Sequence, residues 1–224
     1  MPGEVLKYPG QIHSVLICAI RAVKSCGDYT MSEEEFLVPN DVYMKSGVHI
    51  GTKTRTTYMD AYIYKTRPDG LSVLNVHQID AQIRIAAAAL AKHDPEKIIL
   101  VCRRENGWRP AKLFAKYTGA KAFIGRYPPG ILTNPKLENF IEGEVLLVTD
   151  VWPDRNAVKD GRSAGMSVIA LCDSNNETQH VDIVVPCNNK GKQSLGLVYY
   201  LLVREYLAAR GLPFDAKLED FSEA

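Results

Sequence analysis

The chain has 224 residues, 46% of them hydrophobic and 24% charged, which is ordinary for a folded globular protein and excludes disorder of the whole chain. Its apolar runs, such as residues 195–203, are far shorter than the roughly 18 residues that a membrane-spanning helix needs, so we expect no membrane partner. The formal net charge of +1 excludes a uniformly basic or acidic protein, although it averages over segments of opposite sign.

The first 30 residues differ from the rest of the chain and are predicted to be an extension outside the core. They lack the basic leader and the cleavage site of a secretory signal peptide. An alternative is an amphipathic helix over residues 11–24 that docks on a partner. The following residues, 31–211, predict one α/β domain. Residues 212–224 predict an acidic tail that lies loosely on the surface.

From residue 36 onward, helix and strand patterns alternate. Residues 41–46 predict a short helix that ends at Gly47, and the Pro68-Asp69-Gly70 turn predicts a β-hairpin around it. Apolar residues at helical spacing then predict a helix from Ile79 to Leu90, closed by Asp94-Pro95. Further strands are predicted at 98–102, 122–124, 145–149, 168–172 and 183–185, and further helices at 109–118, 155–164 and 192–210.

Continuous β-branched strands that alternate with helices indicate a mostly parallel sheet covered on both faces. The predicted fold class is therefore α/β, with about five strands in the sheet and a β-hairpin at the N-terminal side. Only nine residues, 173–181, separate the last two strands, which is short for a parallel crossover. The direction of the last strand therefore stays open.

The five cysteines are odd in number, widely spaced and mostly set in apolar stretches. This pattern favours free thiols that pack as small hydrophobic residues, as in a reducing compartment such as the cytoplasm.

Charge is distributed unevenly along the chain. Residues 1–44 carry a net charge of −3, residues 45–136 carry +10, and residues 137–224 carry −6. Such asymmetry is typical of proteins with a polyanionic partner, although a basic face balanced by acidic helices within one fold explains it equally well.

The signatures of nucleotide binding and catalysis are missing. No Gly-x-Gly-x-x-Gly pattern follows a strand, and the Gly191-Lys192 turn lacks the upstream glycine of a P-loop. That turn opens a helix and favours an anion, which a nucleotide or RNA supplies equally well. No Cys or His spacing typical of a metal site is present, and His49 between apolar residues favours hydrogen-bonded packing. Asp150 and Asp173 follow strands, where capping is the commoner role of an aspartate.

The basic block places arginine, lysine and aromatic residues at turns and strand ends. Arginine forms bidentate contacts with phosphate, and aromatic side chains stack on unpaired bases, so the block favours RNA. Solubility alone is the simpler explanation for the same charges, and Trp108 is explained equally well as the anchor of its helix. The block contains Lys53, Arg55, Lys65, Arg67, Arg103, Arg104, Arg109, Lys112, Arg126 and Lys136, with Tyr58, Tyr62, Tyr64, Trp108 and Tyr127 among them.

Six segments in the same order resemble the universal ribosomal protein S2 family of the small subunit. They begin with Ser46-Gly47-Val48-His49-Ile50-Gly51-Thr52 and extend over nearly the whole predicted domain, about residues 36–211. The others lie at residues 67–76, 118–135, 148–150, 170–176 and 186–191. Ile131, Cys187 and Val151-Trp152 depart from the family pattern, so detailed RNA contacts of those loops are not carried over.

The resemblance implies a non-enzymatic structural constituent of the small ribosomal subunit near the junction of its head and body. Its partners would be small-subunit rRNA and other small-subunit ribosomal proteins, and its role would be to support translation and subunit assembly. The implied fold is a three-layer α/β/α sandwich with a flavodoxin-like sheet. The helix ending near His93 leads directly into strand 98–102, without the helical insertion of bacterial members, and the long tail of eukaryotic relatives is missing. The sequence therefore resembles the archaeal type.

We expect RNA contacts from seven basic residues, and no cofactor, metal ion or small-molecule substrate. The expected contacts are Lys53, Arg55, Arg103, Arg109, Arg126, Lys190 and Lys192. The alternative is a nucleotide-binding α/β enzyme that uses the loops after Thr149 and Cys172 together with the Lys190-Gly191-Lys192 turn.

Overall fold

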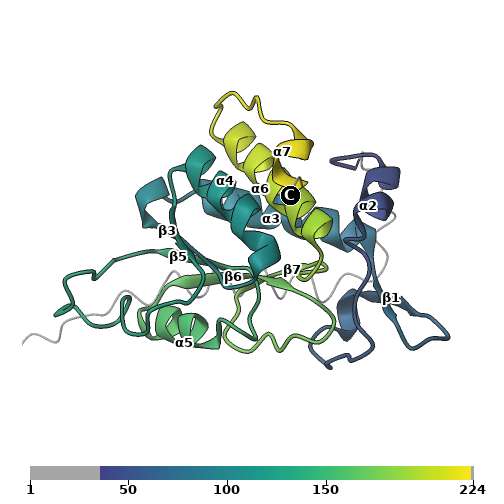
Figure 1. The fold of residues 1–224 in the computed structure, drawn as a ribbon, viewed down its shortest axis with the longest axis horizontal. Coiled ribbons are helices and arrows are strands. Elements are labelled where there is room, and N and C mark those ends of the chain that lie inside the picture. The colour runs from purple at the N-terminus through teal and green to yellow at the C-terminus, as the bar shows by residue number, and fades with distance from the viewer. Residues whose placement is uncertain (1–35, 223–224) are drawn as a thin grey trace, which may run out of the picture. The chain divides into compact units, whose positions relative to one another are not determined.

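The computed structural model describes residues 36–222, so the predicted extension over residues 1–30 lies outside the described part. Within that part, five parallel strands form one sheet in the order β4-β3-β5-β6-β7 (Figure 1). Counted along the chain, this is the order 2-1-3-4-5 of flavodoxin-like sheets, which confirms the predicted fold class. The strands are β3 (Ile98–Cys102), β4 (Lys121–Ile124), β5 (Val145–Val148), β6 (Ser167–Cys172) and β7 (Ile183–Pro186).

The sheet is covered on both faces, as its continuous apolar strands predict. Three long helices cover one face, and α5 (Arg155–Ser163) covers the other together with the loop over residues 125–144 (Figure 1). Along β3, Leu100 packs toward the three helices, whereas Ile99 and Val101 pack toward α5, because successive side chains of a strand point to opposite faces. The three helices are α3 (Val76–Ala91), α4 (Trp108–Thr118) and α6 (Lys192–Ala209).

A β-hairpin and a short helix lie beside the β7 side of the sheet (Figure 1). The hairpin consists of β1 (Ile63–Thr66) and β2 (Ser72–Leu74), and the helix α2 (Asn40–Ser46) ends at Gly47, whose φ of +69° suits glycine. The hairpin was predicted at the N-terminal side, and this placement needs correction. The hairpin is not at the N-terminus: it follows α2 in the chain and begins at Ile63. Short 3-10 helices lie at Asp60–Tyr62, Pro95–Lys97 and Glu105–Gly107.

The last strand, whose direction stayed open, runs parallel to its neighbour. Ile169 pairs with Ile183 and Cys172 with Pro186. Ten residues, 173–182, connect β6 to β7. They suffice because ten extended residues reach about 33 Å, whereas a four-residue strand spans only about 13 Å. The connection therefore returns along the sheet without a helix.

The acidic tail does not lie loosely, contrary to expectation. Its helix α7 (Leu218–Ser222) packs on α6, and Phe221 is only 1% exposed. The Phe221 ring stacks on Tyr117 at 6.2 Å between ring centroids and meets Tyr200 edge-on at 5.8 Å. Phe221 therefore anchors the acidic tail. The free energy gained by burying its ring exceeds the cost of holding this short segment against α6.

Close approach of α7 to α6 depends on Gly196. A Cβ atom at this position would lie 2.8 Å from the carbonyl oxygen of Phe221, which is backbone and cannot rotate away. We expect Gly196→Ala to displace α7 and to lower the free energy of unfolding by roughly 1–3 kcal/mol. Hydrogen exchange should then show weaker protection over residues 212–222.

The control for this prediction is Gly161→Ala, whose Cβ would meet the Leu146 side chain on the opposite face of the sheet. It should leave exchange of residues 212–222 unchanged. Unchanged tail protection in Gly196→Ala would mean that α7 does not depend on this close approach.

The cysteines within residues 36–222, namely Cys102, Cys172 and Cys187, are free and buried. Burial raises the pKa of the Cys102 thiol to about 11, so the thiolate is disfavoured at neutral pH. Among the helices described, none combines the length and hydrophobicity required to cross a bilayer.

Candidate nucleic-acid interface

Loops that follow the parallel strands meet at the carboxyl edge of the sheet and are held together by a buried ion pair. Asp150, after β5, is 1% exposed, and its Oδ2 accepts from Arg104 Nη2 at 2.5 Å and Nε at 2.7 Å. Its Oδ1 accepts from the Trp152 amide and from Asn176 Nδ2. Asp150 thus caps a turn, as predicted for an aspartate after a strand, and also joins the loops after β3, β5 and β6.

A second ion pair joins the loops after β6 and β7. Lys190 Nζ lies 3.0 Å from Asp173 Oδ2 and 3.2 Å from Asn175 Oδ1. Asp173 is 1% exposed, and its Oδ1 accepts from the Ser174 amide. Lys190, one of the seven predicted RNA contacts, is therefore engaged within the chain. The nucleotide-binding alternative relied on the same lysine, whose ammonium group already has a carboxylate partner.

Four of the predicted contacts lie along adjoining grooves at this edge. Arg103 and Lys190 line one groove, and Arg109 and Lys192 line the next. Glu105 and Asn106 belong to both grooves, so the two are continuous. Arg103 is exposed, and its Nη1 donates to the Pro153 carbonyl at 3.2 Å. Arg126 is exposed after β4, at the end of the outermost strand.

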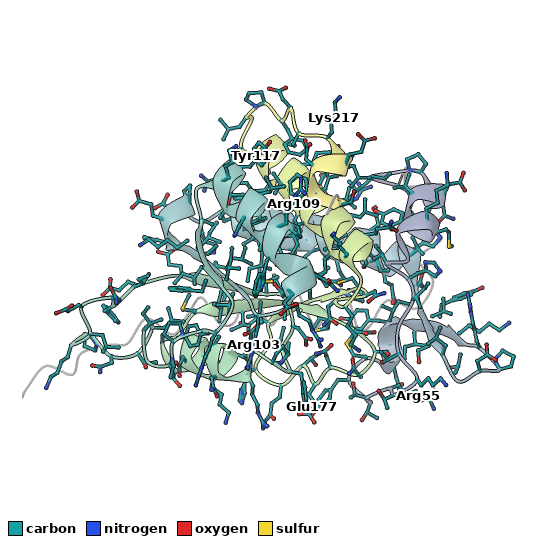
Figure 2. All side chains as sticks on the ribbon, in the orientation of Figure 1. Arg55, Arg103, Arg109, Tyr117, Glu177 and Lys217 are labelled. Atoms are coloured by element: carbon teal, nitrogen blue, oxygen red, sulfur yellow. The ribbon has the colours of Figure 1, made fainter. Side chains whose placement is uncertain are left out.

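Lys53 and Arg55 form a separate exposed group near the hairpin. Figure 2 shows Arg55 well apart from Arg103 and Arg109. Their loop is nonetheless held rigidly, because the Thr52 amide donates to Ser174 Oγ at 2.8 Å and Thr56 Oγ1 donates to the Asn176 carbonyl at 2.7 Å. Arg55 lies 3.9 Å from Asp60, and both side chains are about half exposed, so this ion pair contributes little to stability.

Sequence reasoning missed three residues of this edge. Trp152 is 79% exposed between β5 and α5, and Arg155 and Lys159 line the same groove. They lie within residues 137–224, where the net charge of −6 masks local basic residues. The signal was present, because Arg155 and Lys159 are four residues apart in a predicted helix and hence share one face.

His49 is buried at 8% exposure, which agrees with packing, but its Nδ1 has no hydrogen-bond partner, contrary to the expected hydrogen bond. Within residues 36–222, no group of three His, Cys, Asp or Glu side chains has the arrangement of a metal site.

Asp154 is a buried carboxyl group next to this network. It is 2% exposed, its Oδ2 accepts from the Arg103 amide, and its Oδ1 has no partner. Burial raises the pKa of Asp154 from 3.8 to about 6. The folded chain therefore binds this proton more tightly than the unfolded chain. Burying the charged carboxylate therefore lowers the free energy of unfolding by its full amount above about pH 6. This cost disappears below pH 3.8, where the carboxyl group is protonated in both the folded and the unfolded chain.

We expect Asp154→Asn to raise the free energy of unfolding at pH 7 by about 2 kcal/mol, because the amide cannot ionise. The gain should shrink as the pH falls and disappear below the ordinary carboxyl pKa of 3.8. Urea unfolding at several pH values measures it. The control, Asp94→Asn, changes an exposed aspartate and should alter stability by less than about 0.5 kcal/mol at every pH. A gain of equal size at low and neutral pH would contradict the buried-charge explanation.

The chain is similar to proteins of the small ribosomal subunit. The family model described as ribosomal protein S2 matches residues 138–209. The small ribosomal subunit protein uS2 of Ignicoccus hospitalis is 48% identical over 178 residues, which cover 79% of this chain and 84% of the relative. The proteins of the same name from Picrophilus torridus and Thermoplasma acidophilum are 46% and 45% identical, covering 81% and 84% of this chain and 90% and 98% of the relatives.

Proposed function

The chain belongs to the ribosomal protein S2 family of the small ribosomal subunit, in its archaeal type, and from this membership we propose that it binds small-subunit rRNA through its exposed basic residues. Its relatives are ribosomal proteins and not enzymes. We further propose that it contacts neighbouring small-subunit proteins near the junction of head and body, in cytoplasmic ribosomes, and supports subunit assembly and translation.

One observation carries the RNA proposal: the buried acids of the carboxyl edge are paired within the chain, whereas several basic side chains at and beside this edge are exposed. Asp150 and Asp173 are neutralised by Arg104 and Lys190. Arg103, Arg109 and Arg126 are exposed around them, and Lys53 and Arg55 form a second exposed basic group near the hairpin. Phosphate contacts from such residues supply most of a sequence-independent affinity for RNA.

The direct test is sedimentation of cell lysate through a sucrose gradient, probing for this protein at low and high salt. Migration with the small subunit that resists moderate salt is expected. A peak confined to the top of the gradient at low salt would contradict the proposal.

Lys53 and Arg55 provide a specific test of the interface near the hairpin. We expect the Lys53→Glu/Arg55→Glu variant to enter small subunits several-fold less well than wild type in competition, because like charges repel the phosphates. For purified protein and rRNA, the slope of log K against log salt should flatten by about 0.7–0.9 for each phosphate that the variant no longer neutralises.

The matched control reverses two exposed lysines elsewhere, Lys92 at the end of α3 and Lys217 beside α7. Figure 2 places Lys217 far from Arg55. Lys92→Glu/Lys217→Glu should enter subunits like wild type. Equal incorporation of both double variants would remove Lys53 and Arg55 from the interface.

A further inference from the structure

Both tryptophans of the chain are accessible at the carboxyl edge of the sheet. Trp152 follows β5 and is 79% exposed, and Trp108 begins α4 after β3 and is 38% exposed. A large aromatic side chain this exposed forgoes the free energy that its burial would supply. Exposed aromatic residues beside basic groups are typical of surfaces that stack on unpaired bases.

Three adjoining grooves connect the two tryptophans. Trp152 lines two of them, of about 380 and 490 Å³, and the second continues through Glu105 and Asn106 into a third of about 360 Å³ that Trp108 lines. We call this continuous path the tryptophan trough. Each groove is comparable in volume to a small-ligand site, but the three together form an extended path rather than a closed pocket.

Positive charge predominates along the tryptophan trough. The acidic side chains that line it are Glu105 and Glu177, whereas arginine and lysine line all three grooves. Arg104 and Lys190 are neutralised by their buried partners. The other basic lining residues are Arg103, Arg109, Lys112, Arg155, Lys159 and Lys192.

The Trp108 indole and the backbone beside Trp152 are both hydrogen-bonded to Arg103, in the loop after β3. Trp108 Nε1 donates to the Arg103 carbonyl at 3.3 Å. The Trp152 amide donates to Asp150, and Arg103 Nη1 donates to Pro153, the residue after Trp152. Arg103 thus contacts the Trp108 indole and the residue after Trp152, and it lines the same groove as Trp152. The backbone that carries both tryptophans is therefore fixed before any partner binds, which lowers the entropic cost of binding.

We propose that the tryptophan trough binds an unpaired stretch of RNA, with one base stacked on Trp152, another on Trp108, and the backbone phosphates held by the surrounding arginines and lysines. Stacking requires a free base face, which a duplex does not offer, so the partner is single-stranded. An acidic protein segment would satisfy the charges but would leave both indole rings without stacking partners. This inference rests on the proposed RNA-binding function and specifies the conformation of the RNA and the residues that recognise it.

Fluorescence of the full-length chain tests the proposal, because these two are its only tryptophans. The Trp108→Phe variant reports on Trp152 alone, and Trp152→Phe reports on Trp108 alone. Oligouridylate is expected to quench both reporters, and an RNA duplex of equal length to quench neither. Trp152→Ala should weaken oligouridylate binding by about 5- to 160-fold, as stacking energies of about 1–3 kcal/mol imply. The control Tyr64→Ala removes an aromatic residue that is 75% exposed on the hairpin and should leave binding unchanged.

Three outcomes would overturn the proposal: quenching by the duplex as strong as by oligouridylate, no quenching by either, or quenching by oligoglutamate but not RNA. A photoreactive residue at position 152 in ribosomes then identifies the source of the strand, since crosslinks to rRNA or to messenger RNA both support the trough and crosslinks to protein alone oppose it. Normal sedimentation of Trp152→Ala with the small subunit would separate failure of the trough from failure of the ribosomal function.

Discussion

Replacing Arg104 with alanine is expected to lower the free energy of unfolding by about 3–5 kcal/mol. Asp150 is 1% exposed, and Arg104 provides two of its hydrogen bonds as well as its counter-charge. Without Arg104, the carboxylate stays buried with only the Asn176 amide and one backbone amide as partners. Removing one member of a buried ion pair is costly because the remaining charge is uncompensated. Urea unfolding of the purified chain measures the decrease.

Two variants separate this effect from a general sensitivity of the loop. Arg103→Ala removes the neighbouring but exposed arginine and should cost less than about 1 kcal/mol. Arg104→Ala/Asp150→Asn removes the buried charge together with its partner and should recover much of the stability. A decrease below about 1 kcal/mol in Arg104→Ala would show that the pair behaves like an exposed surface ion pair.

The ion pair matters for function because it fixes the loops that carry the proposed contacts. Asn176 bonds to Asp150, and Asn189 Nδ2 bonds to Asn176 Oδ1 at 3.1 Å, so the loops after β5, β6 and β7 form one network. Arg103 and Trp152 are neighbours in sequence of Arg104 and Asp150. Loosening the network is therefore expected to weaken RNA binding even though Arg104 itself is only about one-third exposed.

The sheet was predictable from sequence because its strands are buried on both faces. Burial of this kind produces continuous apolar runs such as Ile98–Cys102, which differ clearly from the amphipathic helices between them. The direction of β7 was not predictable, because a ten-residue connection without a helix leaves no periodic pattern to read. Packing of α7 was also missed, since its charge dominates the composition while Phe214 and Phe221 determine its position.

The candidate site was predictable in outline but not in its pairings. Strand ends identified Arg103 and Lys190 as residues of the carboxyl edge, because parallel strands end at a common edge. Which cation is paired with a buried acid depends on loop geometry, and Asp173 lies 17 residues from Lys190 in sequence. Trp152 also follows a predicted strand, but the net charge of −6 over residues 137–224 gives no indication of the basic groove around it.

Asp80 on α3 is the second residue whose replacement should have a large effect, because it holds the beginning of the domain in place. Its Oδ1 accepts from the Tyr43 hydroxyl at 2.7 Å and from the Leu37 amide at 3.0 Å, and its Oδ2 accepts from Arg84 Nε at 3.0 Å. Asp80 is 6% exposed, and Tyr43 is fully buried. Arg204 on α6 donates to the Leu37 carbonyl, so both peptide groups of Leu37 are fixed.

We expect Asp80→Ala to lower the free energy of unfolding by about 3 kcal/mol, because it leaves the buried Tyr43 hydroxyl and the Leu37 amide without acceptors. Hydrogen exchange should show the weakened protection concentrated in residues 36–46. A double-mutant cycle with Tyr43→Phe measures the hydrogen bond itself, since removing both partners leaves no unsatisfied hydroxyl. The double variant should therefore be more stable than the sum of the two single effects predicts, by about 1 kcal/mol or more. Strict additivity would mean that the Tyr43–Asp80 hydrogen bond contributes nothing to stability.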